Sequence, residues 1–351
     1  MKVARLVDVE RIDLFDEPIP EPKAGEVLVR MRAVGICGSD LHYFNHGGLG
    51  SHKVRLPFEL GHEPAGEVVY ANRSERFKEG DQIAIDPGLP CLDCEHCNQG
   101  LYNLCTRGWY MGAGTLPGAF REFVAVNERQ LLKLEEGVSA EAGAMLEPFG
   151  VGFHAVQVAG VRVGQTVAVI GAGAIGLSTL AAARLAEPAE TFIIDKLSYR
   201  ADVARRVFAA DHAIIASETD PIPYIMDATN GRGVDVAFDA TGSEEAVDTC
   251  LRIAAAAGKV VLIGIPQADF LSFNPHVARM KELKILNVRR SNQTLAHCYH
   301  LYLKDRVPLE KMVTHRFPLE AIGEAFDTAS CYRDGVIRAV VTFDEATATP
   351  F

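Results

Sequence analysis

The stretch that decides the fold is TVAVIGAGAIGLSTLAAARLAEPAETFIID, residues 166–195. It begins with a short apolar run typical of a buried strand, and a second such run, 189–195, follows a helical segment. The glycines Gly171, Gly173 and Gly176 stand between the first strand and the helix. Such glycines permit a tight turn, let the backbone approach a pyrophosphate and allow close helix–strand packing, while the helix N-terminus attracts phosphate. The stretch therefore predicts a dinucleotide-binding unit.

The acidic residue that ends this stretch bears on the choice of dinucleotide. Asp195 lies 24 residues after Gly171, where a carboxylate binds the adenosine ribose 2′-hydroxyl and would repel a 2′-phosphate. This favours NAD over NADP, although Lys196 and Arg200 soften the preference. The residues expected at the cofactor here are Gly171, Gly173, Ala174, Ile175, Gly176, Asp195, Lys196 and Arg200.

Further alternation of strand and helix follows along the chain. Residues 234–242 and 258–266 are expected to form buried strands, and the segment SEEAVDTCLRIAAAA, 243–257, is expected to be helical between them. We therefore predict one parallel-sheet nucleotide domain over residues 151–289. Ligands of such sheets bind at the carboxyl ends of the strands. This places four more residues at the cofactor: Thr241, Gly242, Ile263 and Gly264.

The first part of the chain has a different predicted secondary structure from the nucleotide domain. Short alternating strands are expected within 26–35, 80–85 and 118–126, separated by glycine turns and long loops. This pattern predicts a β-rich, barrel-like domain over residues 1–150. The tail contains a helix followed by a strand and is expected to complete this domain with residues 290–351. The fold class is thus α/β, a β-rich domain joined to a doubly wound parallel sheet.

Composition limits the kinds of partner. The 351 residues are 48% apolar and carry 35 Lys and Arg against 46 Asp and Glu, a net charge of -11 without a basic block. We therefore expect a small-molecule ligand and no nucleic-acid or membrane partner. The apolar run 167–186 is long enough to raise a membrane interpretation, but its glycines and Arg184 favour a buried strand, turn and helix. The first residues lack the apolar core of a signal peptide, so a cytoplasmic protein with reduced thiols is expected.

Four of the eight cysteines fall within fifteen residues, in the lobe 88–107. Their spacing, CxxCxxCx7C, lets thiolates converge on one centre and suits a closed, tetrahedral structural zinc site. Iron–sulfur clusters also use CxxCxxC runs, but with another fourth spacing and often a following proline. We favour structural zinc over a cluster or inert thiols. The four residues are Cys91, Cys94, Cys97 and Cys105.

A second set of metal-binding residues stands beside glycines elsewhere in the chain. It comprises Cys37, His62 with Glu63, and Glu147. A catalytic zinc takes three protein ligands and keeps one position open. Each residue also has a plainer interpretation: a buried thiol, a loop histidine, and a carboxylate near a helix N-terminus. Their separation in sequence is too wide for spacing alone to decide.

Taken together, these motifs resemble the zinc-containing medium-chain dehydrogenases, and among them the sorbitol (polyol) dehydrogenase-like branch. The resemblance covers almost the whole chain. It implies a GroES-like catalytic domain, a Rossmann coenzyme domain, and two zinc ions per chain, one structural and one catalytic. The matching motifs are GICGSDLHYFNHG (35–47), LPFELGHEPAGEVV (56–69), CLDCEHCNQGLYNLC (91–105), GAFREFVAVN (118–127), EPFGVGFHA (147–155), GAGAIG (171–176) and FPLEAIGEAF (317–326).

The resemblance also assigns roles at the catalytic zinc. It implies that Cys37 and His62 bind the metal, with Glu63 or Glu147 as a further ligand or as the residue that holds the metal's water. Ser39 and His42 match the hydroxyl and imidazole of the family's proton relay. Together with Cys37, His62, Glu63 and Glu147, they are the catalytic residues that the resemblance implies. A carboxylate at Glu147, where alcohol dehydrogenases place a cysteine, favours the polyol branch.

The resemblance implies a substrate as well. Tyr43 and Arg289 match residues that line the polyol pocket, so the expected reaction passes hydride from a secondary hydroxyl of a polyol or sugar-derived alcohol to NAD and leaves a ketose. The alternatives are an L-idonate-type sugar-acid or a threonine-type dehydrogenase on the same scaffold, and more remotely a non-catalytic dinucleotide-binding protein. Arg289 with Arg290 would suit a sugar acid, although Arg290 is better explained as a solvated charge. Members of this family commonly form dimers and tetramers, so the resemblance implies a homo-oligomer of one of these sizes.

Overall fold

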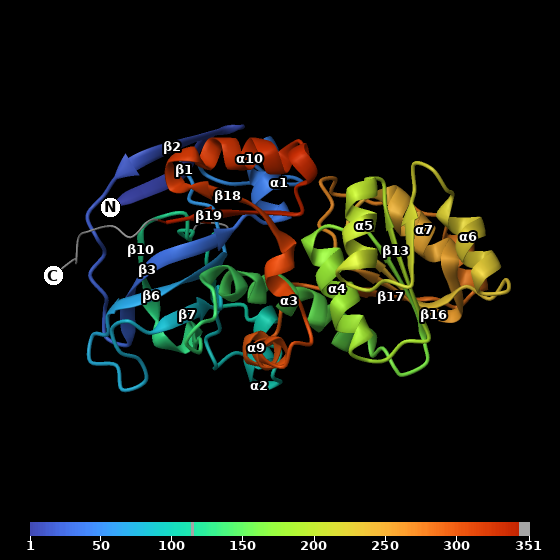
Figure 1. Ribbon diagram of the computed structural model, residues 1–351, viewed down its shortest axis with the longest axis horizontal. Coiled ribbons are helices and arrows are strands. Elements are labelled where there is room, and N and C mark those ends of the chain that lie inside the picture. The colour runs from blue at the N-terminus through green and yellow to red at the C-terminus, as the bar shows by residue number, and fades with distance from the viewer. Residues whose placement is uncertain (114–115, 344–351) are drawn as a thin grey trace. The chain divides into compact units, whose positions relative to one another are not determined.

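The computed structural model describes residues 1–113 and 116–343 (Figure 1). The chain folds into two compact units. The first comprises Met1–Glu147 together with the chain from Leu309, and the second comprises Pro148–Pro308. The tail thus returns to the first unit from Leu309, whereas residues 290–308, which we expected there, belong to the second unit. Each unit is described by itself.

The first unit is built around a mainly antiparallel sheet. In the described residues its strands run in the order β11-β7-β6-β3-β19-β18, and β10 also pairs with β3. Figure 1 shows the late strand β19 between the early strand β3 and the late strand β18. The strands of this sheet are β3 (Glu26–Gly35), β6 (Glu63–Tyr70), β7 (Gln82–Ile85), β10 (Phe123–Asn127), β11 (Leu131–Lys133), β18 (Val313–Pro318) and β19 (Arg338–Thr342).

Strand β3 forms the centre of this sheet because its sequence suits burial on both faces. The segment EVLVRMRAVG is rich in β-branched residues, and most of its side chains are buried. It pairs antiparallel with β6, β10 and β19, so residues more than 300 positions apart become neighbours. The core beside it includes Phe44, Phe120 and Phe326. The β-rich first domain predicted from sequence is confirmed.

Shorter elements complete the first unit. β1 and β2 form an antiparallel pair, and β8 pairs with β9 beside the cysteine lobe. The remaining elements are β1 (Lys2–Asp8), β2 (Arg11–Asp16), β4 (Gly48–Leu49), β5 (His52–Lys53), β8 (Gly88–Leu89), β9 (Trp109–Tyr110), and the helices α1 (Gly38–His46), α2 (Glu95–Asn98) and α10 (Ile322–Ser330). Helix α3 (Ala140–Ala159) begins in this unit and continues into the second.

The second unit contains a parallel sheet of the expected kind. Its strands run in the order β14-β13-β12-β15-β16-β17, so the chain starts at the middle, moves to one edge and then to the other. Such a reversal creates a ligand-binding crevice at the carboxyl ends of the central strands. The strands are β12 (Thr166–Ile170), β13 (Glu190–Asp195), β14 (His212–Ile215), β15 (Val234–Asp239), β16 (Ala254–Leu262) and β17 (Lys284–Asn287).

Helices cover both faces of this sheet. Figure 1 shows α4 and α5 on one side of β13 and α6 and α7 on the other. The nucleotide fold predicted from sequence is therefore confirmed. The helices of this unit are α4 (Ala174–Arg184), α5 (Ser198–Arg206), α6 (Pro221–Ala228), α7 (Glu244–Ile253), α8 (Pro275–Met280) and α9 (Leu295–Leu303). No helix of the described residues is both long and apolar enough to cross a lipid bilayer.

One element was predicted wrongly. Residues 243–257 were expected to be helical throughout, but α7 ends at Ile253 and strand β16 begins at Ala254. Four consecutive alanines favour helix in isolation. Here Ala254 pairs with Val234 of β15, and Ala257 takes a φ of +58°, so sheet pairing overrides the local preference.

Candidate metal centres and dinucleotide site

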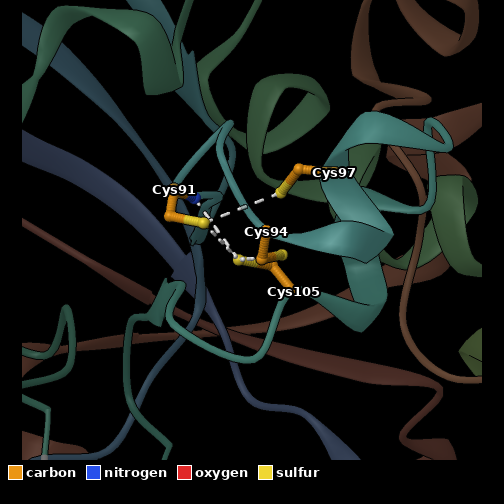
Figure 2. A group of neighbouring side chains, drawn as sticks. All are labelled: Cys91, Cys94, Cys97 and Cys105. Carbon is orange, nitrogen blue, oxygen red and sulfur yellow. Dashed lines mark hydrogen bonds between the residues drawn. The ribbon is translucent and has the colours of Figure 1, made fainter.

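The four cysteines of the lobe meet at one point in the first unit. Figure 2 shows their sulfur atoms turned toward one another. The Sγ atoms of Cys91 and Cys97 lie 3.9 Å apart, those of Cys94 and Cys105 3.7 Å, and those of Cys105 and Cys91 3.4 Å. All four are free thiols. Sulfurs at the corners of a tetrahedron with zinc–sulfur bonds of about 2.3 Å are separated by about 3.8 Å, so these distances fit a structural zinc.

The protonation chemistry of the lobe also fits a cation. The backbone N–H of Cys97 is the main reason that the pKa of Cys94 falls to about 5. The pKa of Cys97, by contrast, is raised to about 11, mainly by burial. With these opposite pKa shifts, Cys94 and Cys97 do not both carry a negative charge at neutral pH without a positive charge nearby. A bound divalent cation would supply that charge.

A second metal-binding group lies in the same unit. Cys37 precedes helix α1, and His62 and Glu63 stand where β6 begins. One ligand atom from each lies within 4.8 Å of the other two. Gly35, at the end of β3, makes room for Glu63, because a Cβ at that position would lie 2.1 Å from Glu63 Oε2. Residues far apart in sequence thus converge through the β3–β6 pairing.

The buried charges at this group are incompletely satisfied. Glu63 is fully buried and His62 is 6% exposed. Within the described residues, neither carboxylate oxygen of Glu63 has a hydrogen-bond partner. Burial raises the pKa of Glu63 against the opposing effects of Arg338 and His62. Burial alone would lower the pKa of His62, but Asp40 and Cys37 raise it well above its usual value. Carboxylate oxygens left without donors beside a cysteine and a histidine are what a divalent cation would satisfy.

Glu147 stands slightly apart from these three residues. It lies on α3, is 5% exposed, and is absent from the group whose ligand atoms lie mutually within 4.8 Å. Its Oε1 accepts a hydrogen bond of 3.1 Å from the Tyr110 hydroxyl. Burial raises the pKa of Glu147 to about 7. Of the two carboxylates left open by the sequence, Glu63 therefore has the geometry of a ligand, and Glu147 that of a neighbour.

Two charged residues of this site were missed by the sequence analysis. Asp40 is fully buried and accepts hydrogen bonds from the backbone N–H of Cys37 (3.0 Å) and Gly61 (3.2 Å). Its Oδ1 also lies 3.4 Å from His62 Nδ1, the arrangement that orients metal-binding histidines. Arg338, at the start of β19, is 4% exposed and has Nη2 3.3 Å from Glu63 Oε1. Asp40 could have been predicted from sequence, because it is an acid at the third position of a helix that begins directly after Cys37. No sequence pattern pointed to Arg338.

The expected relay and substrate residues fall in different places. Ser39 Oγ lies 3.4 Å from His62 Nε2. His42 follows on the same helix and its ring centroid is 6.3 Å from that of His46. Tyr43, expected to line the pocket, is 8% exposed and packs against Phe58 in the core. Two residues lie in the second unit just after β17: Arg289, which is exposed, and Arg290.

The glycine turn of the second unit has the expected geometry. Gly171 adopts a φ of +95°, and a Cβ there would lie 2.7 Å from Thr241 Cγ2. A Cβ at Gly176 would lie 1.7 Å from the carbonyl oxygen of Gly171, so only glycine fits. Gly173 precedes α4, which starts at Ala174 and includes Ile175. The turn thus brings a glycine-rich backbone to the start of an eleven-residue helix, an arrangement that suits a pyrophosphate.

The end of β13 carries the expected acid. Asp195 accepts hydrogen bonds from the backbone N–H groups of Ala172 (2.7 Å) and Leu197 (2.9 Å), which fix its carboxylate beside the glycine turn. Arg200 Nη1 lies 4.0 Å from Asp195 Oδ2. Lys196 instead reaches outward to Glu245, at 2.7 Å between two exposed side chains.

The carboxyl ends of strands β15 and β16 contact each other. Asp239 Oδ1 accepts hydrogen bonds from the Thr241 hydroxyl (2.8 Å) and the Gly242 backbone (3.1 Å), and its carbonyl accepts from Ile263 (2.9 Å) and Gly264 (3.0 Å). A Cβ at Gly264 would lie 2.0 Å from Gly242 N. The four predicted residues therefore form two turns packed backbone to backbone at the carboxyl ends of β15 and β16.

A Cys₄ lobe, a Cys–His–Glu cluster and a glycine-turn parallel sheet in one chain define a zinc-dependent dehydrogenase. Family models agree: residues 23–136 match the alcohol dehydrogenase GroES-like domain, and residues 174–303 match the zinc-binding dehydrogenase domain. The chain belongs to the zinc-containing medium-chain dehydrogenase family, in its sorbitol dehydrogenase-like branch.

Individual relatives cover nearly the whole chain. The sorbitol dehydrogenase of Bacillus subtilis (strain 168) is 32% identical over 342 residues, 97% of each chain. The sorbitol dehydrogenase of Bos taurus is 36% identical over 319 residues, 90% of this chain and 89% of the relative. Among solved structures, an Escherichia coli oxidoreductase of unknown specificity involved in membrane biogenesis superposes with a TM-score of 0.92 at 29% identity, covering 98% of this chain and 99% of that one.

Proposed function

We propose that this chain oxidises a secondary hydroxyl of a polyol or sugar-derived alcohol to a ketone, giving a ketose, with NAD as the hydride acceptor. The observation that carries the proposal is the meeting of Cys37, His62 and Glu63 within 4.8 Å in a chain that is 32–36% identical to sorbitol dehydrogenases. These three residues are proposed to hold a catalytic zinc, and the four lobe cysteines a structural one. A zinc ion held by these residues would supply a Lewis acid able to polarise a substrate oxygen.

The surrounding residues are proposed to prepare this site. Asp40 Oδ1, 3.4 Å from His62 Nδ1, is proposed to keep the imidazole proton on that nitrogen, which leaves Nε2 to act as a ligand. Arg338 balances part of the charge of Glu63. Ser39 and His42 stand three positions apart on α1 and thus on one helix face, where the two side chains are proposed to carry the substrate proton toward solvent. Glu147, a buried carboxylate held by Tyr110, is proposed to bind a neighbouring hydroxyl of the substrate or a water.

The preference for NAD is proposed from the end of β13. The Asp195 carboxylate is held by two backbone N–H groups beside the phosphate turn, where it can accept from the ribose 2′-hydroxyl and would repel a 2′-phosphate. Thr241, Gly242, Ile263 and Gly264 are proposed to line the nicotinamide half of the cofactor. The test is the ratio of kcat/KM for NAD and NADP, which should fall in Asp195→Ala. An unchanged ratio would refute this assignment.

One experiment tests the whole proposal. Purified protein is assayed for zinc per chain and for NADH formation with sorbitol, xylitol, L-idonate, L-threonine and 2-propanol. We expect about two zinc ions per chain and turnover with the polyols. Cys37→Ser should lose one zinc and at least about 100-fold in kcat while keeping its melting temperature within a few degrees. Tight NAD binding without oxidation of any alcohol would instead favour the non-catalytic alternative, and preference for L-idonate the sugar-acid alternative.

We further propose a cytoplasmic homo-oligomer of two or four chains. The support is the likeness to sorbitol dehydrogenases over nearly the whole chain. Sedimentation equilibrium at micromolar concentration measures the mass directly, and a mass of one chain would refute the oligomer.

A further inference from the structure

Tyr110 touches the candidate active site on two sides. Its hydroxyl donates to Glu147 Oε1 at 3.1 Å. Its ring centroid lies 5.9 Å from that of His62, a proposed zinc ligand. Tyr110 thus contacts one carboxylate and one imidazole of the site at once, so its contacts extend beyond the single hydrogen bond to Glu147.

Tyr110 also belongs to the cysteine lobe. It is the second residue of β9, which pairs antiparallel with β8 so that Tyr110 faces Gly88. Only five positions separate it from Cys105. Between them, Gly108 is tightly packed, because a Cβ there would lie 3.2 Å from Cys105 Sγ and 3.1 Å from the carbonyl oxygen of Leu89. The strand carrying Tyr110 therefore starts directly against a lobe sulfur.

The chain beyond Tyr110 is anchored to the other metal group. The Met111 backbone donates to the carbonyl of Pro87 at 2.9 Å. Gly112 has a φ of +62°, and a Cβ there would lie 2.4 Å from the carbonyl oxygen of Gly61, the residue before His62. The segment from Cys105 to Gly112 thus packs against the lobe at one end and against the backbone next to His62 at the other.

From this continuous path we infer that Tyr110 is a positioning residue for Glu147, and that the four-cysteine lobe controls the active site by placing Tyr110. The inference deepens the proposed function and rests on it, since it assumes that Glu147 serves the reaction at Cys37, His62 and Glu63. Displacing β9 then moves the Tyr110 hydroxyl away from Glu147. The lobe becomes a part of the catalytic apparatus as well as a support of the fold.

The first test removes only the hydroxyl. Tyr110→Phe keeps the ring against His62 but leaves Glu147 without this donor. In the zinc-loaded enzyme we expect kcat for sorbitol oxidation to fall about 10-fold, with KM changed less than about 2-fold. The reason is that losing a hydrogen-bond partner just outside the metal ligands typically lowers activity or metal affinity about 10- to 100-fold. Release of the zinc held by Cys37 to excess chelator, followed with a colorimetric zinc indicator, should accelerate about 10-fold. Tyr102→Phe, a hydroxyl removed from the same lobe, is the matched control and should change neither rate.

The second test displaces the strand without removing a metal ligand. Gly108→Ala keeps all four lobe sulfurs and adds a methyl group against Cys105 and Leu89. Trp109, the one tryptophan of the sequence, neighbours Tyr110 on β9 and reports the displacement through its fluorescence. We expect Gly108→Ala to lower kcat and accelerate zinc release about 3-fold in the wild-type background, and to change both less than about 1.5-fold when Tyr110→Phe is already present. Cys105→Ser, which removes a lobe ligand, should show the same non-additivity.

The outcomes separate the two parts of the inference. Unchanged kcat and unchanged zinc release in Tyr110→Phe overturn the positioning role. Effects of Gly108→Ala and Cys105→Ser that multiply with that of Tyr110→Phe overturn the link to the lobe. If no polyol is oxidised, the proposed function fails, while the zinc-release rates still decide whether Tyr110 connects the two metal groups.

Discussion

Replacing Arg338 by methionine provides a direct measure of the buried charge at the metal site. Arg338 is 4% exposed, its partner Glu63 is fully buried, and their closest atoms lie 3.3 Å apart. The guanidinium also donates to the backbone carbonyl of Ile36. Methionine fills much of the same volume but removes the guanidinium charge, the largest opposing influence on the buried Glu63.

The cost follows from these contacts. Removing one partner of a buried ion pair costs about 3–5 kcal/mol, because the remaining charge stays buried and uncompensated. At about 2–4 °C per kcal/mol for a unit of this size, the metal-free protein should melt about 10 °C lower. Added zinc should narrow the difference, because a cation beside Glu63 restores a positive charge. The double variant Glu63→Gln, Arg338→Met should lose about 1–3 kcal/mol less free energy of unfolding than the two single variants lose together.

The chain offers a matched control in an exposed pair. Arg316 Nε lies 2.5 Å from Glu141 Oε1, but the Arg316 side chain is 51% exposed. Arg316→Met should therefore cost less than about 1 kcal/mol. Both variants are measured by differential scanning calorimetry after zinc removal, with ellipticity as a second probe. Equal losses for the two arginines, or a loss below about 1 kcal/mol for Arg338→Met, would refute the argument that burial sets the cost.

Three further outcomes are expected. Burial raises the pKa of Glu147 from 4.5 to about 7, so between these pH values the native carboxyl keeps a proton that the unfolded one has lost. The free energy of unfolding of the metal-free protein should therefore fall by up to about 3 kcal/mol as pH rises from about 5 to about 7. Glu147→Gln should flatten this pH dependence in melting curves. Gly176→Ala places a methyl 1.7 Å from the Gly171 carbonyl oxygen, so NAD affinity by titration calorimetry should fall at least about 10-fold; wild-type affinity would contradict the turn geometry. Cys91→Ser should lower zinc by about one per chain and the melting temperature by several degrees; elemental analysis that still finds both ions would count against the lobe site.

Much of the nucleotide domain could be predicted because its signals are local. The glycine turn, the strands around it and Asp195 fall within thirty consecutive residues, and the reasons for each lie in backbone geometry and packing. The same locality explains why the lobe was predicted from spacing alone. The error at Ala254–Ala257 has the opposite origin, since pairing with Val234 of β15 outweighs an alanine preference for helix.

The active site depended on contacts that no local pattern encodes. Sequence presented Cys37, His62, Glu63 and Glu147 as candidates and left the choice between the two carboxylates open; the tertiary structure places Glu63 with the first two and Glu147 against Tyr110.

The sequence by itself determined the two domain types, the glycine turn and the four-cysteine cluster of the lobe, because each depends on neighbours in the chain. Only the tertiary structure decided that Arg338, from a strand near the end of the chain, lies against Glu63, and that Tyr110 spans the lobe and the active site. The reason is physical: a buried charge is stabilised by whichever opposite charge folding brings within a few ångströms, and strand pairing across 300 residues chooses that partner.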